Sequence, residues 1–508
     1  MGSLRNLLLW NASIRDPFLL AFVTMCMLSL AMMFMSRPRS YLPFVLLTAP
    51  LPKLFTIANY EITAANGVAA PGFSLVDIVL GAGIIAILLR RWTPPKNVES
   101  RRFGRAMMWW SASVICSVGI GLLLWPGLYR PIYSVYAIRY LLTLASYAVA
   151  AQYARIDYSE GMLQKLLHRL TVAGNATVLL GLSYYFIFGS SGQGTHGVDL
   201  AMGGQGVLLS RTFFWFFDYG NDMGFFATLV GILNIISLSD RRRMGLRLLA
   251  AVGLAGCVAT DLLIGERADV LVLAVSVIYF IVETMKFRHR SVRVSIVFQF
   301  VCLISVIAIF AGTLSILAPD LIEKKFQHTV GENIDQETSI EVMTGAGVPA
   351  NLANAVASLP IGDFAGRLSL NIAGLFYFFN HPAGVGFWGE LFVAGFYSHH
   401  EVIKVAIEQG FPGIITFIGL LVALRRLLWS SKDLPGAAGR LNIVLRAISA
   451  GLFAALVMAN TVLLDMKFML VYWTLVGVWS VVPRGAVRRA CPATTFYEQL
   501  PHGAGVRG

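Results

Sequence analysis

The chain has 508 residues, of which 40 are Lys or Arg and 27 are Asp or Glu, so its formal net charge is +13. Charged residues make up only 13% and apolar residues 57%, with a mean hydropathy of +0.70. Soluble domains average roughly 25% charged residues, so this composition excludes a soluble enzyme, a disordered scaffold and a secreted disulfide-rich module. We predict an all-α polytopic membrane protein.

Apolar runs recur along the chain, each long enough to cross much or all of a hydrocarbon layer of roughly 30 Å as a helix. We predict spans at residues 17–35, 41–58, 74–89, 107–125, 132–153, 170–189, 222–238, 246–264, 268–285, 294–318, 400–424, 445–464 and 467–482. The first run is predicted to be retained, because no small-residue cleavage site follows it. Counting one of the first two runs as a half-span gives twelve spans, which we prefer to thirteen.

The connections between the runs alternate between basic and non-basic. Clusters of Lys and Arg lie at residues 90–105, 155–169, 241–247, 286–293, 425–446 and 484–507. Since Lys and Arg accumulate on the cytoplasmic side, the C-terminus is predicted inside and the long connection before residue 400 outside. The basic excess is therefore attributed to topology and to anionic lipid headgroups, and nucleic-acid binding is not predicted.

This pattern divides the chain into five predicted regions. They are N-terminal transmembrane helices at 1–204, central transmembrane helices with outward arginines at 205–318, a large periplasmic loop at 319–399, C-terminal transmembrane helices at 400–483 and a cytoplasmic tail at 484–508. The five cysteines have neither disulfide-framework nor metal-ligand spacing.

Two outward segments carry an arginine close to membrane depth. Arg211 stands in an aromatic segment that continues through Asn221 and Asp222 into the next span, and Arg267 follows a tight turn and opens another. An arginine at that depth usually meets an anion, a carboxylate or water. An interfacial aromatic belt and neutralisation by local carboxylates are the structural alternatives. The functional interpretation is that the planar guanidinium groups hold a phosphate.

The third outward segment runs from Arg367 through His381 to the adjacent His399 and His400 at the start of a span. A helix N-terminus disfavours the imidazolium, and a neutral imidazole there can take a proton from a hydroxyl as a general base. The alternative is an interfacial histidine pair without chemistry. We predict no metal, because adjacent histidines project in different directions and no third ligand has the usual spacing.

The span that follows these histidines contains two further signals. Lys404 and Glu408 are four residues apart, which predicts an ion pair within the helix. Gly410 and Gly413 bracket Pro412, which predicts a kink or close packing at that point. Both are structural predictions and assign no chemistry.

Three segments together resemble the signature of the O-antigen ligase and polymerase superfamily of membrane glycosyltransferases. They are Asn380-His-Pro-Ala-Gly-Val-Gly-Phe387, Ser398-His-His400 and Glu408-Gln-Gly-Phe-Pro-Gly413. The family signature has a Pro-x-x-Gly-x-Gly turn, then Ser-His-Asn, then Glu-x-Gly-x-x-Gly on the following helix. His399 matches the family's histidine, whereas His400 stands where asparagine is usual.

Weaker likenesses accompany these segments over residues 205–425. Arg211 with Asn221 is similar to the family's arginine-to-asparagine segment, and Arg367 to the arginine before its Pro-Gly turn. Arg267 matches the arginine of a Ser-Arg-Gly turn, although the residues on both sides of it differ from that pattern.

The resemblance implies a fold of the GT-C type and an active site facing the periplasm from the bacterial inner membrane. It implies metal-independent, inverting transfer of a glycan from undecaprenyl pyrophosphate to a sugar hydroxyl, without a cofactor. A chain-length regulator is a further partner implied for a polymerase. In this interpretation His399 is the base, with His400 as the next candidate, and Arg211, Arg267 and Arg367 bind pyrophosphate. The supporting residues are Asn221, Asp222, His381 and Glu408.

Other functions remain open at this point. Polymerisation of O-antigen or exopolysaccharide repeats is favoured, and a ligase that transfers the glycan to lipid A–core is the alternative within the family. Twelve spans with scattered charges also fit a secondary transporter or a lipid-linked glycan flippase. Transporters commonly have two related halves, whereas the polar groups here gather at the outward ends of helices.

Overall fold

The computed structural model describes residues 17–51, 53–56, 72–90, 97–129, 134–156, 158–188, 220–238, 244–264, 267–285, 336–358, 362–396, 398, 400–430, 434, 436–457 and 467–482. Within these ranges the regular secondary structure is helical apart from one antiparallel pair of short strands, β1 (Lys53–Thr56) and β2 (Gly72–Ser74).

Most of the described helices overlap the predicted apolar runs, whereas α14, α15 and α16 lie in the region predicted as a loop. They are α2 (Pro17–Ser36), α3 (Tyr41–Thr48), α5 (Leu75–Arg90), α6 (Val98–Leu124), α7 (Ser134–Ile156), α8 (Glu160–Phe188), α9 (Gly220–Leu238), α10 (Met244–Ile264), α11 (Arg267–Met285), α14 (Gln336–Gly345), α15 (Ala350–Ala357), α16 (Gly362–Asn380), α17 (Glu401–Trp429), α18 (Gly436–Val457) and α19 (Lys467–Ser480). A 3₁₀ turn at Pro38–Ser40 and a π-helical turn at Glu390–Ala394 complete the helical elements of the described ranges.

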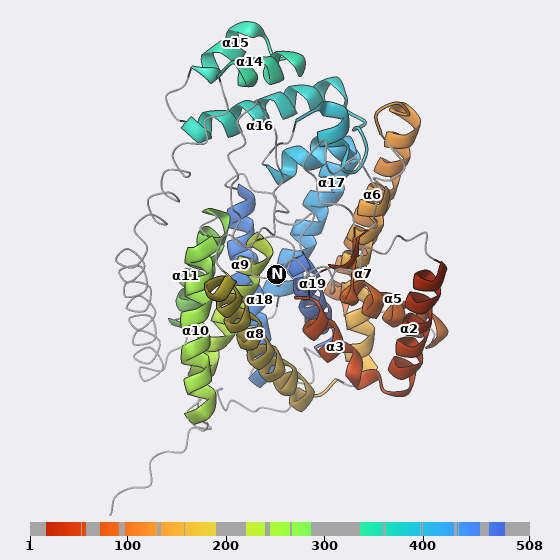
Figure 1. Ribbon diagram of the computed structural model, residues 1–508, viewed down its shortest axis with the longest axis vertical. Helices are drawn as coiled ribbons and strands as arrows, with labels where there is room; N and C mark the ends of the chain where they lie inside the picture. Colours follow the sequence, from red (N-terminus) through yellow and green to blue (C-terminus); the bar gives the residue numbers. More distant parts are fainter. Residues whose placement is uncertain are drawn as a thin grey trace, which may run out of the picture.

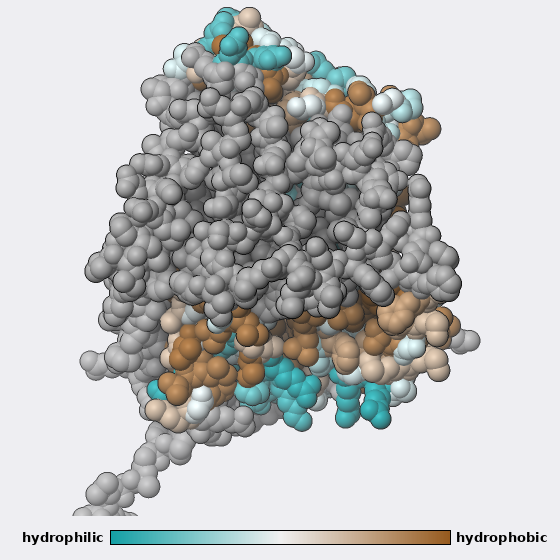
Figure 2. Space-filling view, viewed as in Figure 1, coloured by the Kyte–Doolittle hydropathy of each residue, from teal (hydrophilic) through white to brown (hydrophobic). Residues whose placement is uncertain are grey.

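The described residues contain four helices that are long and apolar enough to cross a membrane. They lie at Val98–Leu124, Met244–Asp261, Glu401–Trp429 and Gly436–Val457, and a bent helix pair near the N-terminus raises the number to five. On the face visible in Figure 2, apolar residues gather in a band with hydrophilic residues along its lower edge. The chain is thus a helical membrane protein. The predicted span at 294–318 lies outside the described residues.

The first two predicted spans form a single bent unit. The axes of α2 and α3 are inclined by 114°, and α3 ends at Thr48 instead of continuing to residue 58. Pro50 and Pro52 follow, and neither has a backbone N–H to extend the helix. The chain then enters β1, so the predicted span at 41–58 is wrong in its second half. The short α3 agrees with the half-span that we preferred.

Region 319–399, predicted as one large loop, contains three helices. In Figure 1, α14, α15 and α16 lie together at one end of the molecule, and α17 runs from there into the bundle. Met343 of α14 and Phe378 of α16 belong to the same buried apolar cluster as Ile403 and Ile407 of α17. A Cβ on Gly374 would lie 2.6 Å from Ile403 Cγ2, so this glycine sets the close approach of α16 to α17.

Small residues also allow close packing inside the bundle. A Cβ at Gly451 of α18 would lie 2.6 Å from the Val272 carbonyl oxygen of α11. Asn175 of α8 and Asn234 of α9 exchange two amide hydrogen bonds of 2.9 and 2.7 Å, and Gly253 of α10 leaves the space for Asn175. Small residues and interhelical amide bonds are the usual means of helix association in membranes.

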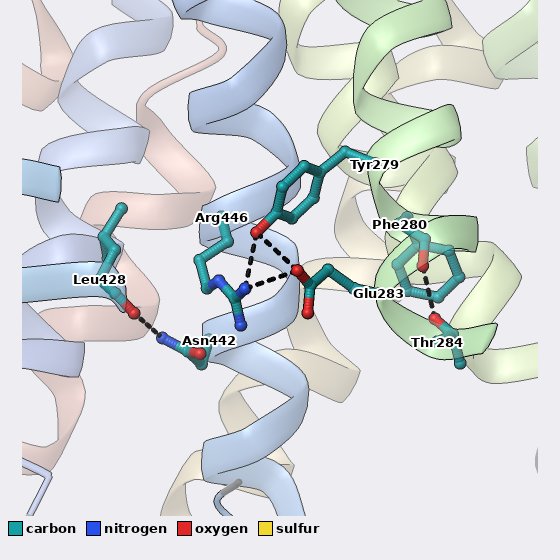
Figure 3. A network of polar contacts seen from close by, with 7 residues as sticks. All are labelled: Tyr279, Phe280, Glu283, Thr284, Leu428, Asn442 and Arg446. Atoms are coloured by element: carbon teal, nitrogen blue, oxygen red, sulfur yellow. Dashed lines mark hydrogen bonds and ion pairs between the residues drawn. The ribbon is translucent and has the colours of Figure 1, made fainter. Parts of the chain in front are cut away.

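A buried ion pair joins α11 to α18 at the end of α17 opposite Glu401 (Figure 3). The Arg446 guanidinium is 2.9 Å from the Glu283 carboxylate and donates to the Tyr279 hydroxyl at 2.6 Å. Its carbon also lies 5.5 Å from the centre of the Trp429 ring, at the C-terminus of α17. This network ties three helices together, and its side chains occupy the interior of the bundle.

Candidate functional site

Two of the three segments that carry the family resemblance are hydrogen-bonded to each other through their backbones. The Val385 N–H donates to the Ile407 carbonyl oxygen at 2.9 Å, and the Gly386 N–H donates to that of Glu408 at 3.0 Å. In return, the Phe411 N–H donates to the Pro382 carbonyl oxygen at 3.1 Å. The loop at 382–386 therefore docks directly onto α17.

The break in α17 explains why its backbone accepts this loop. Gly410 has φ 66° and ψ −160°, a conformation that only glycine adopts readily. Pro412 has no N–H to give to the Glu408 carbonyl, four residues earlier. The carbonyls of Ile407 and Glu408 thus lose their helical partners, and the loop replaces them. The kink predicted around Pro412 is confirmed.

The glycines of both segments lie where a Cβ atom would clash with neighbouring atoms. Gly384 and Gly386 have φ of +87° and +104°, and a Cβ on Gly384 would lie 2.7 Å from the Glu408 carbonyl oxygen. A Cβ on Gly386 would collide with the Tyr129 ring at 2.6 Å, and one on Gly410 would lie 2.6 Å from the Ala383 carbonyl carbon. The pattern Pro-x-x-Gly-x-Gly therefore has a packing role here.

Helix α6 also forms hydrogen bonds to the kinked part of α17. Ser117 Oγ donates to the Glu408 carbonyl oxygen at 2.7 Å, and Ser113 Oγ donates to Gln409 Oε1 at 2.9 Å. Just after α6, the Tyr129 hydroxyl donates to the Phe387 carbonyl oxygen at 2.7 Å. The loop, the kink and α6 thus form one hydrogen-bonded unit.

Four ionisable side chains gather in this buried region. Glu390, Glu401, Lys404 and Glu408 are each at most 1% exposed. Lys404 Nζ lies 4.5 Å from the centre of the Trp388 ring, and neither carboxylate oxygen of Glu408 has a hydrogen-bond partner among the described residues. No hydrogen bond therefore joins Lys404 to the Glu408 carboxylate, so the predicted pair is not a direct bridge. The Lys404 ammonium lies over an aromatic face, which attracts a cation.

His400 forms the N-cap of α17. It has extended φ and ψ of −113° and 116°, and its Nδ1 accepts the Val402 N–H at 3.2 Å. Burial lowers the pKa of His400, which favours the neutral ring. Since Nδ1 accepts a hydrogen bond, Nε2 carries the proton. The cap thus gives His400 a structural role at the start of α17.

His381 lies immediately after α16 and between two aromatic rings. Its ring centre is 5.2 Å from that of Trp125 and 4.6 Å from that of Tyr377. Its backbone N–H donates to the Tyr377 carbonyl oxygen at 2.9 Å, which closes the last turn of the helix. These contacts place His381 at the start of the docking loop.

The remaining predicted site residues are only partly described. Arg211 and His399 lie outside the described residues. Arg267 is the first residue of α11, Arg367 belongs to α16, and Asn221 and Asp222 belong to the first turn of α9, but their side chains are not among those described. Of the predicted site residues, His381, His400 and Glu408 thus have described side chains: His381 precedes the docked loop, Glu408 lies where that loop docks, and His400 caps α17 about two turns earlier.

Several residues of this region were missed from the sequence. Glu390 accepts a backbone hydrogen bond close to the histidine pair, and Ser113, Ser117 and Tyr129 hold the loop against α6. One signal was present for Glu390, because it is the only charged residue in the apolar stretch 387–397. Hydroxyl groups on a transmembrane helix carried no comparable signal.

No family model and no curated protein matches this chain. Among the described residues, no group of three or more His, Cys, Asp or Glu side chains is arranged to hold a metal ion.

Proposed function

We propose that the protein is a membrane glycosyltransferase that polymerises surface polysaccharide, either O-antigen or exopolysaccharide repeats. The donor is a glycan on undecaprenyl pyrophosphate, and the acceptor is a sugar hydroxyl at the outer face of the inner membrane. The observation that carries the proposal is the backbone docking of residues 382–386 onto the kink at Gly410. The docking joins two of the three segments that carry the resemblance into one hydrogen-bonded unit.

The docked loop and the capped helix define where the chemistry would occur. His400 caps α17, so in the chain His399 directly precedes the cap, about two helical turns before the carbonyls onto which the loop docks. In the proposed reaction, His399 takes the proton of the acceptor hydroxyl. The acceptor oxygen then bonds to the anomeric carbon. At the same time, the bond between the anomeric carbon and the pyrophosphate oxygen breaks. The bond electrons leave with pyrophosphate, and the configuration inverts.

Pyrophosphate gains negative charge as it departs, which needs positive groups already in place. We assign this role to Arg211, Arg267 and Arg367. Planar guanidinium groups bind phosphate oxygens in pairs. Asn221, Asp222, His381 and Glu408 are assigned supporting roles around the same face.

His399 and His400 provide a matched pair of substitutions for the central test. The gene is deleted in its host and complemented with wild type, His399→Asn or His400→Asn. Asparagine is a good N-cap, so His400→Asn is expected to restore long glycan chains. His399→Asn is expected to restore none, since asparagine cannot accept the proton. Full complementation by His399→Asn would remove His399 as the base.

The glycans are separated into the lipid-linked pool and the lipopolysaccharide or secreted polymer. A deletion strain whose lipid-linked pool holds only single repeats supports a polymerase. Long chains left on undecaprenyl pyrophosphate, with bare lipid A–core, would instead identify a ligase. Unchanged glycans in the deletion strain would contradict both and favour transport.

Arg267 gives a second, independent prediction in the same strain. Arg267→Ala is expected to abolish chain extension while the protein still accumulates in the membrane at the wild-type level. Arg425→Ala is the control, because Arg425 is exposed near the opposite end of α17 and is not assigned to donor binding. Near-normal glycans with Arg267→Ala would remove Arg267 from the pyrophosphate site.

A further inference from the structure

Glu390 is a buried carboxylate that the proposed reaction does not use. It opens the π-helical turn Glu390–Ala394 and is 1% exposed. One of its oxygens, Oε1, accepts the backbone N–H of Ser398 at 2.7 Å. Ser398 is itself fully buried and directly precedes His399. The carboxylate thus closes the chain between residues 390 and 398 into a loop.

The chain is anchored on both sides of His399. Before it, Ser398 is held by the Glu390 carboxylate, and after it, His400 is held by the Val402 N–H. The turn that carries Glu390 begins only two residues after Trp388, a residue with φ 64° whose ring stacks on Tyr136 at 4.6 Å. The anchor therefore connects the histidine pair to the same packed unit that holds the docked loop.

We propose that Glu390 is a positioning residue, whose hydrogen bond to the Ser398 N–H holds the backbone immediately before His399. This inference rests on the proposed function, because His399 has a catalytic role only there. Glu390 touches neither donor nor acceptor in this proposal. Its effect on glycosyl transfer is transmitted through the backbone of Ser398.

The pKa of Glu390 depends on its burial and on the charged side chains that face it. Lys404 of α17 lowers its pKa, Glu401 of α17 raises it, and Glu408 of the same helix faces it as a further carboxylate. Burial is the largest effect and raises the pKa of Glu390 from 4.5 to about 7. A carboxyl whose pKa is raised on folding stabilises the fold fully below about pH 4.5, and this contribution is lost as the pH rises through 7.

The test compares wild type with Glu390→Gln, which keeps an oxygen acceptor, and Glu390→Ala, which removes it. Glycosyl transfer is measured in membrane vesicles that contain the native lipid-linked donor. Glu390→Ala is expected to lose about 10²-fold in turnover, as a misplaced catalytic group does. Glu390→Gln is expected to retain most of the activity. Equal losses in both variants would overturn the positioning role.

A second measurement reports the anchor without glycosyl transfer. Ser398→Cys is introduced into all three proteins and labelled with a membrane-impermeant maleimide, and matching chains without it give the background of the five native cysteines. The new cysteine is expected to be protected in wild type and Glu390→Gln. It is expected to be about tenfold to a hundredfold more reactive in Glu390→Ala, where the hydrogen bond is lost. Equal labelling in all three would overturn the anchor.

Thermal unfolding of the purified proteins checks the burial of the charge. Glu390→Gln is expected to unfold at a higher temperature than wild type at pH 8, and the difference is expected to shrink as the pH falls through 7 and to vanish below about pH 4.5. A difference that does not depend on pH would contradict the buried carboxylate. If His399→Asn is fully active while labelling and unfolding follow expectation, the proposed function fails and the Glu390 anchor stands.

Discussion

Replacing Gly410 by alanine is expected to destabilise the protein more than any other single methyl group added to α17. Gly410 occupies a backbone region that is nearly exclusive to glycine, and strain of that kind costs about 1–3 kcal/mol. The added Cβ would also lie 2.6 Å from the Ala383 carbonyl carbon. That contact would push the docked loop away from the carbonyls of Ile407 and Glu408, so the loss is expected to exceed the strain alone.

Gly419→Ala is the matched control on the same helix. A Cβ at Gly419 meets nothing within 4 Å, and alanine is favoured over glycine inside a helix by roughly 1 kcal/mol. The midpoint temperature of thermal unfolding in detergent should therefore fall for Gly410→Ala, and it should stay the same or rise for Gly419→Ala. Indistinguishable midpoints for the two variants would contradict the kink and its docked loop.

Replacing Arg446 by methionine is also expected to destabilise the protein strongly. Arg446 is 1% exposed and bonded to both Glu283 and Tyr279. Removing one partner of a buried ion pair costs about 3–5 kcal/mol, because the other charge stays buried without compensation. The Glu283 side chain is 15% exposed, so water can partly solvate its charge. The expected loss of stability therefore lies at the lower end of this range.

A double-mutant cycle separates the interaction energy of the Arg446–Glu283 ion pair from the packing of the aliphatic parts of the two side chains. Glu283→Gln together with Arg446→Met should recover most of the stability lost in Arg446→Met alone, because no unpaired charge remains. Arg425→Met serves as the control, since substitutions at exposed sites usually stay within about 0.5 kcal/mol and Arg425 is exposed on α17. Purely additive losses in the cycle would show that the ion pair has no coupling of its own.

The helices could be predicted from the sequence because each depends on local composition. The predicted spans at 268–285 and 467–482 coincide with α11 and α19 within two residues. The prediction at 41–58 failed because hydropathy does not distinguish an apolar helix from an apolar strand. Only Pro50 and Pro52 marked the break. Helices α14, α15 and α16 were missed for another reason. The first two have only 10 and 8 residues, and α16 begins with polar residues, so none forms a long apolar run.

The candidate site was predictable in its parts but not in its contacts. Gly384, Gly386 and Gly410 stood out as glycines in a pattern, and the kink near Pro412 followed from residue type alone. The hydrogen bonds that join the two segments depend on tertiary packing, which residue spacing does not encode. The predicted direct bridge between Lys404 and Glu408 failed for the same reason. Spacing places two side chains on one helix face, whereas the Lys404 ammonium lies over the ring of Trp388, from a distant loop.

The docked loop also constrains the order in which the protein can be assembled. Two carbonyls of α17, those of Ile407 and Glu408, receive their backbone partners from residues 385 and 386 and not from the helix itself. A backbone carbonyl left without a partner in hydrocarbon costs several kcal/mol. Helix α17 therefore cannot reach its final shape when it first enters the bilayer. Its maturation must wait until the segment before it has folded back against α6, so completion of this helix is a late step of biogenesis.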